Sequence, residues 1–221
     1  MIKTPLITDV AEKARKSTII LALAVCSLLA SRQSVAQTAT ATLLQTGTGA
    51  TTFDTTQGAS FSLDLRITTD FISSGITYFL QVSPNGSGFF RITGRNTVGS
   101  PYPSRSFSDA EVTSPMGGLL DPVNDFDLGA INEGSETDPA GNYFISTLTI
   151  LVNPGTPNGS YSIFLDNRSI VTDRTGGGFQ DRPITALATV NVVPEPSTVG
   201  LAVVGGARLL LLLRRKQRAR V

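Results

Sequence analysis

Two clusters of acidic residues are the parts of this sequence whose residue types and spacing could bind a metal ion or serve catalysis. The first cluster lies within 121–127 and consists of Asp121, Asn124, Asp125 and Asp127. The second lies within 133–138 and consists of Glu133, Glu136 and Asp138. Calcium binds six to eight oxygen ligands on flexible acidic loops, so the first cluster is a candidate calcium site. Its spacing differs from the EF-hand loop, and Asx turns on a solvated edge account for the same residues.

Asp173 and Asp181 flank a glycine-rich turn and are a second, weaker calcium candidate. Paired carboxylates also serve glycosidases, but that chemistry requires the two groups to face each other across a cleft. The chain has no histidine and one cysteine, Cys26, so a serine or cysteine nucleophile has no evident base. Nucleophile-elbow and phosphate-loop motifs are missing too. We therefore expect a non-catalytic protein without a cofactor.

The segment 37–193, which would have to position these residues, reads as an all-β domain. Apolar and polar residues alternate with period two in several short runs, as half-buried strands require. These runs are 59–68, 76–82, 143–152, 161–165 and 187–193. Turns rich in glycine and proline separate them, and no window has a helical period. The pattern predicts an antiparallel two-sheet sandwich.

Details of the sandwich also follow from the pattern. In the run 143–152 the expected core face consists of Phe144, Leu148, Ile150 and Val152. The region from about 94 to 136 is less regular, with long loops expected at 100–104 and 116–122. The segment 152–163 resembles the strand–turn–strand of cohesin-like and immunoglobulin-like modules. The chain has no tryptophan and four tyrosines, so it has few of the aromatic side chains that usually stack on sugar rings.

The first 36 residues have the three parts of a secretory signal peptide. Lys13, Arg15 and Lys16 end a basic region, and an apolar stretch of 14 residues follows at 17–30. Small residues then precede a cleavage site between Ala36 and Gln37, which we expect signal peptidase to cut. A permanent anchor is the alternative, although 14 residues give only about 21 Å of helix. Acylation at Cys26 is disfavoured because Val25 stands where a lipobox has a small residue.

The C-terminal 28 residues combine three features in a fixed order. The tripeptide Pro194-Glu195-Pro196 comes first, and the apolar run 198–213 follows it. The chain then ends in a basic cluster made of Arg214, Arg215, Lys216, Arg218 and Arg220. The prolines favour an extended, accessible backbone. The basic cluster would remain cytoplasmic and stop translocation.

This order of features resembles the PEP-CTERM sorting signal. The resemblance implies an exported precursor held in the inner membrane of a Gram-negative-type bacterium by a C-terminal helix. It also implies a membrane sorting enzyme, an exosortase, that recognises Pro194-Glu195-Pro196. Arg208 departs from the family pattern by interrupting the apolar run, at a cost of about 2.5–3.5 kcal/mol near a helix centre. The alternative is an ordinary single-span anchor.

Charge is divided among the three segments of the chain. Residues 1–36 carry a net charge of +3 and residues 194–221 a net charge of +5, whereas residues 37–193 carry −7. The acidic central domain is therefore poorly suited to nucleic acid. We expect a surface or extracellular-matrix protein, with extracellular polysaccharide as a further partner. A surface adhesin or carbohydrate-binding module is the alternative.

Overall fold

The computed structural model describes residues 37–84, 88–120, 126–132 and 136–195. The chain divides into two units, and the described strands all belong to the second, Thr38–Val221. The longer strands are β1 Ala39–Gln45, β2 Thr52–Thr56, β3 Ser60–Thr69, β6 Phe90–Asn96, β9 Gly141–Val152, β10 Gly159–Leu165 and β13 Leu187–Val193. The shorter ones are β4 Ser73–Thr77, β5 Leu80–Ser83, β7 Ser104–Arg105, β8 Ala130–Ile131, β11 Ile170–Asp173 and β12 Gln180–Pro183. Two short helices, α2 Asp109–Thr113 and the 3₁₀ turn η1 Thr175–Gly177, complete the described elements.

Period-two alternation places one face of each long strand in the core. In β3 the side chains of Phe61, Leu63, Leu65 and Ile67 are buried, and the residues between them face outward or lie partly exposed. Strand β3 pairs antiparallel with β1 on one side and with β9 on the other. The sequence prediction of this strand is confirmed, as are the strands predicted at 161–165 and 187–193.

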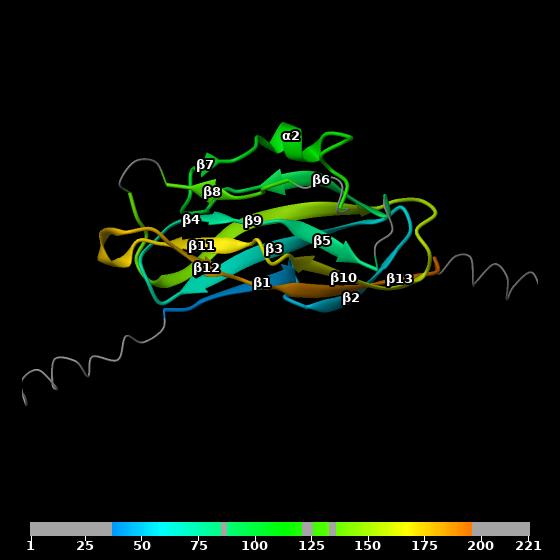
Figure 1. Cartoon of the computed structure of the whole chain (residues 1–221). Helices are drawn as coiled ribbons and strands as arrows, with labels where there is room; N and C mark the ends of the chain where they lie inside the picture. The colour runs from blue at the N-terminus through cyan, green and yellow to red at the C-terminus, as the bar shows by residue number, and fades with distance from the viewer. Residues whose placement is uncertain (1–36, 85–87, 121–125, 133–135, 196–221) are drawn as a thin grey trace, which may run out of the picture. The chain divides into compact units, whose positions relative to one another are not determined.

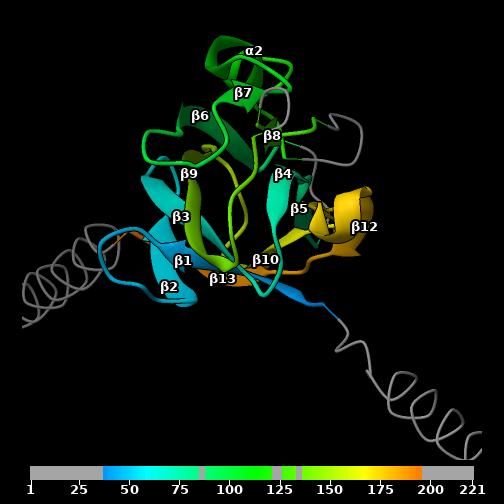
Figure 2. The ribbon, with the colours of Figure 1, turned by 90° about the vertical axis from the view of Figure 1, so that its left-hand side faces the viewer.

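The strands form two facing layers (Figures 1 and 2). The first layer is one sheet with the order β1-β3-β9-β6. The second layer consists of two sheets in line, β2-β13-β10-β5 and β12-β11-β4-β8-β7. The two sheets lie end to end because the chain passes directly from one to the other three times, from β4 to β5, from β10 to β11 and from β12 to β13. All pairs are antiparallel except β2 with β13, so the predicted antiparallel sandwich is confirmed with one parallel pair at an edge.

A break between β4 and β5 interrupts the strand expected at 76–82. Tyr78 and Phe79 leave the ladder there, although Ile76, Tyr78, Leu80 and Val82 are all buried as predicted. The backbone groups freed at the break find other partners. The Tyr78 carbonyl accepts from the Leu128 amide at 2.8 Å, and the Phe79 amide donates to Ser169 Oγ at 3.1 Å. The second layer thus bends without leaving these backbone groups unpaired.

Aromatic rings join the two layers at the end of the sandwich where β13 finishes. Phe53 of β2 packs edge-on against Phe61 of β3, with ring centroids 5.1 Å apart. Phe90 of β6 meets Tyr161 of β10 in the same way at 5.0 Å. The buried core extends from Leu43 to Val192, so the segment 38–195 contains all of the core that the structure describes. We therefore expect this segment to fold without the residues on either side.

The prediction for one core residue is wrong. Leu148, Ile150 and Val152 are fully buried, but Phe144 is only partly buried. A β-bulge shifts the β3–β9 register, so Phe144 pairs with Arg66 and shares its outward face. The Arg66 guanidinium lies 5.8 Å from the centre of the Phe144 ring, and Ile145 is buried instead.

The segment 97–140, here called the crossover segment, connects β6 with β9 and contains β7, α2 and β8. Figure 2 shows that α2 and β7 cover the open side between the layers above β6. The sequence predicts long loops here, and the structure adds short elements held by particular contacts. Leu120 donates its amide to the Phe90 carbonyl at 3.1 Å, which covers part of the outer edge of β6.

Candidate functional site

The sorting tripeptide begins where the last strand ends. Val193, the final residue of β13, still pairs with Thr56, and Pro194 and Glu195 follow it directly as exposed residues. Proline lacks the amide hydrogen that a ladder needs, which explains why the strand stops at this point. A hollow of about 400 Å³ lies beside the motif and is lined by Gln57, Asn158, Val193, Pro194 and Glu195.

Two turns frame this hollow. Gln57 belongs to the turn between β2 and β3, and Asn158 belongs to the loop between β9 and β10. The Gly155 amide donates to Gln57 Oε1 at 3.3 Å, which ties the two turns to each other. The two turns and the end of β13 together line the hollow beside Pro194.

The other residues of the predicted sorting and export signals lie outside the described part of the chain. They are Ala36, Pro196, Arg208, Arg214, Arg215, Lys216, Arg218 and Arg220. Gln37, on the far side of the predicted cleavage site, precedes β1 by two residues. No helix among the described residues combines the length and the apolar character that a membrane crossing requires.

The predicted calcium cluster is only partly described. Asp121, Asn124 and Asp125 lie outside the described residues, whereas Asp127 makes three hydrogen bonds. Its Oδ1 accepts from the Gly129 amide at 2.9 Å and from the Tyr78 amide at 3.3 Å, and its Oδ2 accepts from Ser106 Oγ at 3.0 Å. The described residues contain no group of three His, Cys, Asp or Glu side chains able to hold a metal ion. Asp127 acts here as a cap that fixes the break after β4.

The other carboxylate candidates, Asp173 and Asp181, do not act together. Asp173 is 1% exposed and pairs with Arg182 at 2.9 Å, while Asp181 is exposed on β12. Burial alone would raise the pKa of Asp173, but hydrogen bonds from Thr175 and Arg182 outweigh it and lower the pKa below its ordinary value. This ion pair lies at the end of the β11–β12 ladder where the connecting turn begins.

The β11–β12 hairpin carries an aromatic ring at its tip that sequence reasoning missed. Phe179 is 71% exposed, and the Arg174 guanidinium lies 4.1 Å from the centre of its ring. The tip points away from the end that carries Pro194 (Figure 1). The four tyrosines are a different case, because Tyr78, Tyr102 and Tyr161 are buried and Tyr143 is partly buried. The position of Phe179 directly after the glycines at 176–178 is the sequence signal that could have predicted an exposed aromatic ring here. The tyrosines would have been the wrong choice, because none of them is fully exposed.

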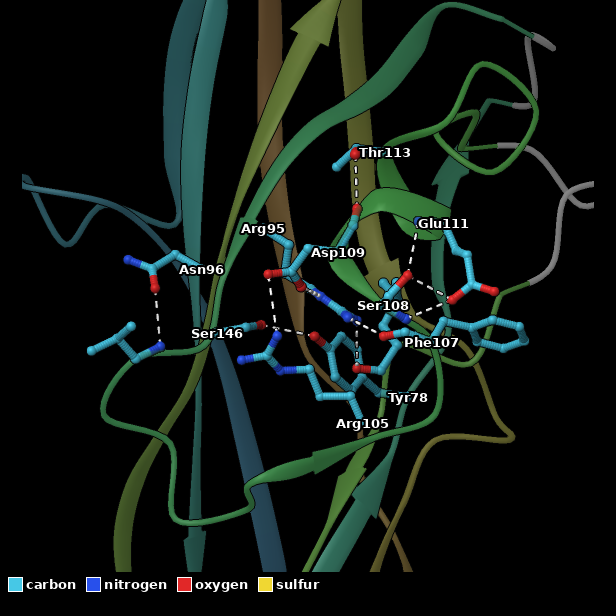
Figure 3. Close-up of polar contacts among 12 residues, drawn as sticks. Tyr78, Arg95, Asn96, Arg105, Phe107, Ser108, Asp109, Glu111, Thr113 and Ser146 are labelled. Carbon is cyan, nitrogen blue, oxygen red and sulfur yellow. Dashed lines mark hydrogen bonds and ion pairs between the residues drawn. The ribbon is translucent and has the colours of Figure 1, made fainter.

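A buried arginine fastens the crossover segment to the first layer, and this contact was also missed. The Arg95 side chain is fully buried, and its Nε donates to Asp109 Oδ1 at 2.6 Å (Figure 3). Its two other nitrogens donate to the carbonyls of Phe107 and Leu128. Buried charges need such partners. We call this set of contacts the Arg95 clip.

A capping box places the carboxylate of the Arg95 clip. Ser108 caps α2, its Oγ accepts from the Glu111 amide at 3.3 Å, and Glu111 Oε2 accepts from the Ser108 amide at 2.8 Å. Hydrogen bonds from Ser108 lower the pKa of the Glu111 carboxyl. The spacing Ser-x-x-Glu is the sequence signal that predicts such a helix start.

Comparisons with known proteins give likenesses in fold and none in sequence. No protein-family model matches, and no curated protein sequence matches. The third ScaB cohesin of R. flavefaciens, solved with a group 1 dockerin, is 14% identical with a TM-score of 0.47, and the match covers 72% of this chain and 97% of that one. The seventh ScaB type I cohesin of Pseudobacteroides cellulosolvens is 8% identical with a TM-score of 0.48, covering 72% and 94%. A non-cellulosomal cohesin of Archaeoglobus fulgidus is 12% identical with a TM-score of 0.43, covering 74% and 96%.

Proposed function

We propose that this chain is an exported, non-catalytic surface or extracellular-matrix protein. Its precursor is held in a membrane by the C-terminal apolar run, and a sorting enzyme then releases or transfers it at Pro194-Glu195-Pro196. The mature protein is the sandwich, and the two basic ends serve export and sorting. The tripeptide, the apolar run and the basic cluster support this proposal through their order in the sequence.

The observation that carries the proposal is the position of the motif relative to the last strand. Strand β13 lies between β2 and β10, so the sandwich depends on it up to Val193. Pro194 and Glu195 are exposed directly after it. The last buried core residue that the structure describes is Val192, so a cut after Glu195 leaves every described core residue in the domain. A processing enzyme can therefore act on the motif while the domain remains folded.

The proposal is tested by the intact mass of the exported protein from its producing cells. We expect a product that starts at Gln37 and lacks the basic cluster 214–220. The double substitution Pro194→Ala/Pro196→Ala restores backbone freedom at the motif and should leave the full C-terminus in the membrane fraction. A wild-type product that still carries Arg214 to Arg220 contradicts the proposal.

A matched control separates the motif from proline content in general. Pro103 and Pro115 are exposed in the crossover segment, so Pro103→Ala/Pro115→Ala changes two prolines outside the motif and outside the two turns that frame the hollow. This variant should be processed like the wild type. Equal loss of processing in both variants would show that the prolines act through folding.

A second candidate function is binding of a polysaccharide by the sandwich itself. The exposed Phe179 ring under Arg174 favours it, because aromatic faces stack on sugar rings. A glycan array with the segment 37–195 should then give a signal that Phe179→Ala removes. The substitution Met116→Ala is a suitable control, because Met116 is 77% exposed elsewhere, in the crossover segment.

A further inference from the structure

The tip of the β11–β12 hairpin carries an arginine without a carboxylate partner. The segment 37–193 contains seven arginines, and four of them form ion pairs with aspartates, namely Arg95, Arg105, Arg168 and Arg182. Arg174 is different, because its guanidinium lies over the Phe179 ring, 4.1 Å from the ring centre. Its side chain makes no hydrogen bond or ion pair with another described residue. This cation is therefore available to a ligand.

Stacking on Phe179 holds the Arg174 guanidinium without using its donors. Arginine carries five N–H donors in the plane of the guanidinium group. A ring over the face of that group fixes its plane and leaves the donors at its rim free. Such a rim can form two parallel hydrogen bonds to one carboxylate. The buried guanidinium of the Arg95 clip is the contrasting case, since its donors are already bonded to Asp109 and to two carbonyls.

Hydrogen bonds fasten the tip to the turn between β3 and β4. The Arg174 amide donates to the Ile72 carbonyl at 2.8 Å, and the Ile72 amide donates to Thr175 Oγ1 at 3.3 Å. The Thr175 amide in turn donates to Asp173 Oδ1 at 2.8 Å. A ligand therefore meets a site whose backbone is already ordered, which reduces the entropy lost on binding.

The glycines between Arg174 and Phe179 leave the space beside the tip open. Gly176 and Gly177 have φ angles of +84° and +82°, which glycine adopts without strain. At these two residues and at Gly178, no atom lies within 4 Å of the position that a Cβ atom would take. A ligand that contacts the ring or the guanidinium consequently meets no side chain from the turn.

The hairpin is also less acidic than the rest of the domain. Residues 170–183 contain two arginines and two aspartates and have no net charge, whereas the segment 37–193 carries −7. Asp173 is buried and paired with Arg182, so Asp181 is the exposed carboxylate of the hairpin. Most of the domain repels an anion, and the hairpin is a place where an anion can approach.

We propose that Arg174 and Phe179 bind an acidic polysaccharide. The carboxylate of a uronic acid residue accepts hydrogen bonds from the rim of the Arg174 guanidinium. The free face of the Phe179 ring, which is 71% exposed, packs on the same sugar or on its neighbour. This binding rests on the second candidate function described above and adds the chemical class of the polysaccharide. A neutral polysaccharide would use the ring and leave the cation without a role.

Titration calorimetry of the segment 37–195 with a short oligogalacturonate tests the proposal. The comparison ligand is the same oligosaccharide with its carboxyl groups reduced to primary alcohols, which keeps the sugar rings and removes the charge. We expect the acidic form to bind about tenfold more tightly, as a hydrogen bond to a charged group provides. This preference should decrease as the salt concentration rises, because the charges are exposed to solvent.

Two arginine variants with the same change in charge separate this site from the charge of the whole domain. Arg174→Gln should abolish the preference for the acidic form and leave the affinity for the reduced form nearly unchanged. Arg66→Gln is the matched control, because Arg66 is exposed in the first layer, 5.8 Å from the centre of the Phe144 ring. This control should bind both forms like the wild type. Both variants should keep the wild-type melting temperature, since the tip is fastened through the Arg174 backbone.

Different results would overturn the acidic ligand and the underlying binding of a polysaccharide. Equal affinities for the two forms, both lowered by Phe179→Ala, would overturn the acidic ligand and support polysaccharide binding in general. Equal loss of the preference in Arg174→Gln and Arg66→Gln would also overturn the proposed site. An oligoglutamate of the same charge that bound as tightly as the oligogalacturonate would exclude a role for the sugar. Binding of neither oligosaccharide would overturn both proposals.

Discussion

The sheet framework, residues 38–96 and 141–193, and the crossover segment, residues 97–140, are stabilised in different ways. The framework buries alternate apolar side chains along long strands, such as Leu63 and Leu65 of β3 and Leu148 of β9. Among its described residues, the crossover segment has one five-residue helix and two strands of two residues. It buries a few apolar side chains without a regular period, such as Val112 and Leu128, and polar contacts fasten it at the Arg95 clip, Asp127 and Tyr102. Apolar burial depends on periodicity, whereas the polar contacts depend on individual side chains. Substitutions should therefore affect the two regions differently.

The largest effect is expected from a cavity in the framework. Leu148 is completely buried between the layers, and Leu148→Ala should lower the free energy of unfolding by about 2–5 kcal/mol. Denaturant unfolding of the segment 37–195 measures this loss, and the whole domain should unfold in one transition. Leu187→Ala on β13 is the control, because this leucine is 54% exposed and should change stability by less than about 0.5 kcal/mol. A similar loss of unfolding free energy in both variants would contradict the view that buried apolar side chains stabilise the framework.

A smaller and more local effect is expected at the Arg95 clip. Asp109→Ala leaves the buried Arg95 guanidinium without its carboxylate, while its bonds to two carbonyls remain. Breaking a buried pair costs about 3–5 kcal/mol, and we expect about 2 kcal/mol here because Asp109 is 39% exposed. Hydrogen exchange should accelerate at the Val112 and Leu128 amides of the crossover segment and remain slow in β3 and β9.

The control for the clip removes the exposed partner of the same carboxylate. Arg105 lies 3.3 Å from Asp109 Oδ2, and both side chains are more than one third exposed. Arg105→Ala should therefore cost less than about 0.5 kcal/mol and leave hydrogen exchange unchanged. Faster exchange throughout the framework in Asp109→Ala would show that the two regions are not separable.

The smallest effect compares two buried tyrosines, one in each region. Tyr78 Oη lies 2.8 Å from Ser146 Oγ in the framework, and Tyr102 Oη lies 2.7 Å from Ser73 Oγ at the crossover segment. Burial raises the pKa of each phenol to about 12. A raised pKa in the folded state contributes stability that is fully present below about pH 10, the ordinary tyrosine value, and is lost as the pH rises toward about 12.

Single substitutions to phenylalanine test this comparison. Tyr78→Phe and Tyr102→Phe should each cost about 1 kcal/mol at neutral pH through the lost hydrogen bond. Each should also make the stability fall less steeply between pH 10 and 12, as followed by denaturant unfolding at several pH values. An unchanged slope in either variant would show that the tyrosine concerned ionises freely in the folded protein.

Much of the framework could be predicted from the sequence because its signal is local. Strand β13 occurs at the predicted residues, and β3 and β10 differ from the predicted runs by one or two residues at an end. The prediction for Phe144 is wrong because a bulge depends on the partner strand, which the sequence of β9 alone does not reveal. The break after Thr77 has the same kind of cause, since Asp127 and Ser169, distant in sequence, supply the hydrogen bonds that stabilise it.

The candidate sites also divide into those that the sequence reveals and those that depend on contacts between distant residues. The order Pro194-Glu195-Pro196, apolar run and basic cluster is a property of the sequence, and so is the segregation of charge that leaves the segment 37–193 acidic. The predicted run 187–193 already places the tripeptide directly after the last strand, and the structure confirms that strand and shows that it lies between β2 and β10. The tertiary structure alone decided that Asp127 caps a break in the second layer and that Arg95 is buried against Asp109. The physical reason is that alternation and charge are read along the chain, whereas edges, bulges and buried pairs exist only once distant strands are hydrogen-bonded side by side.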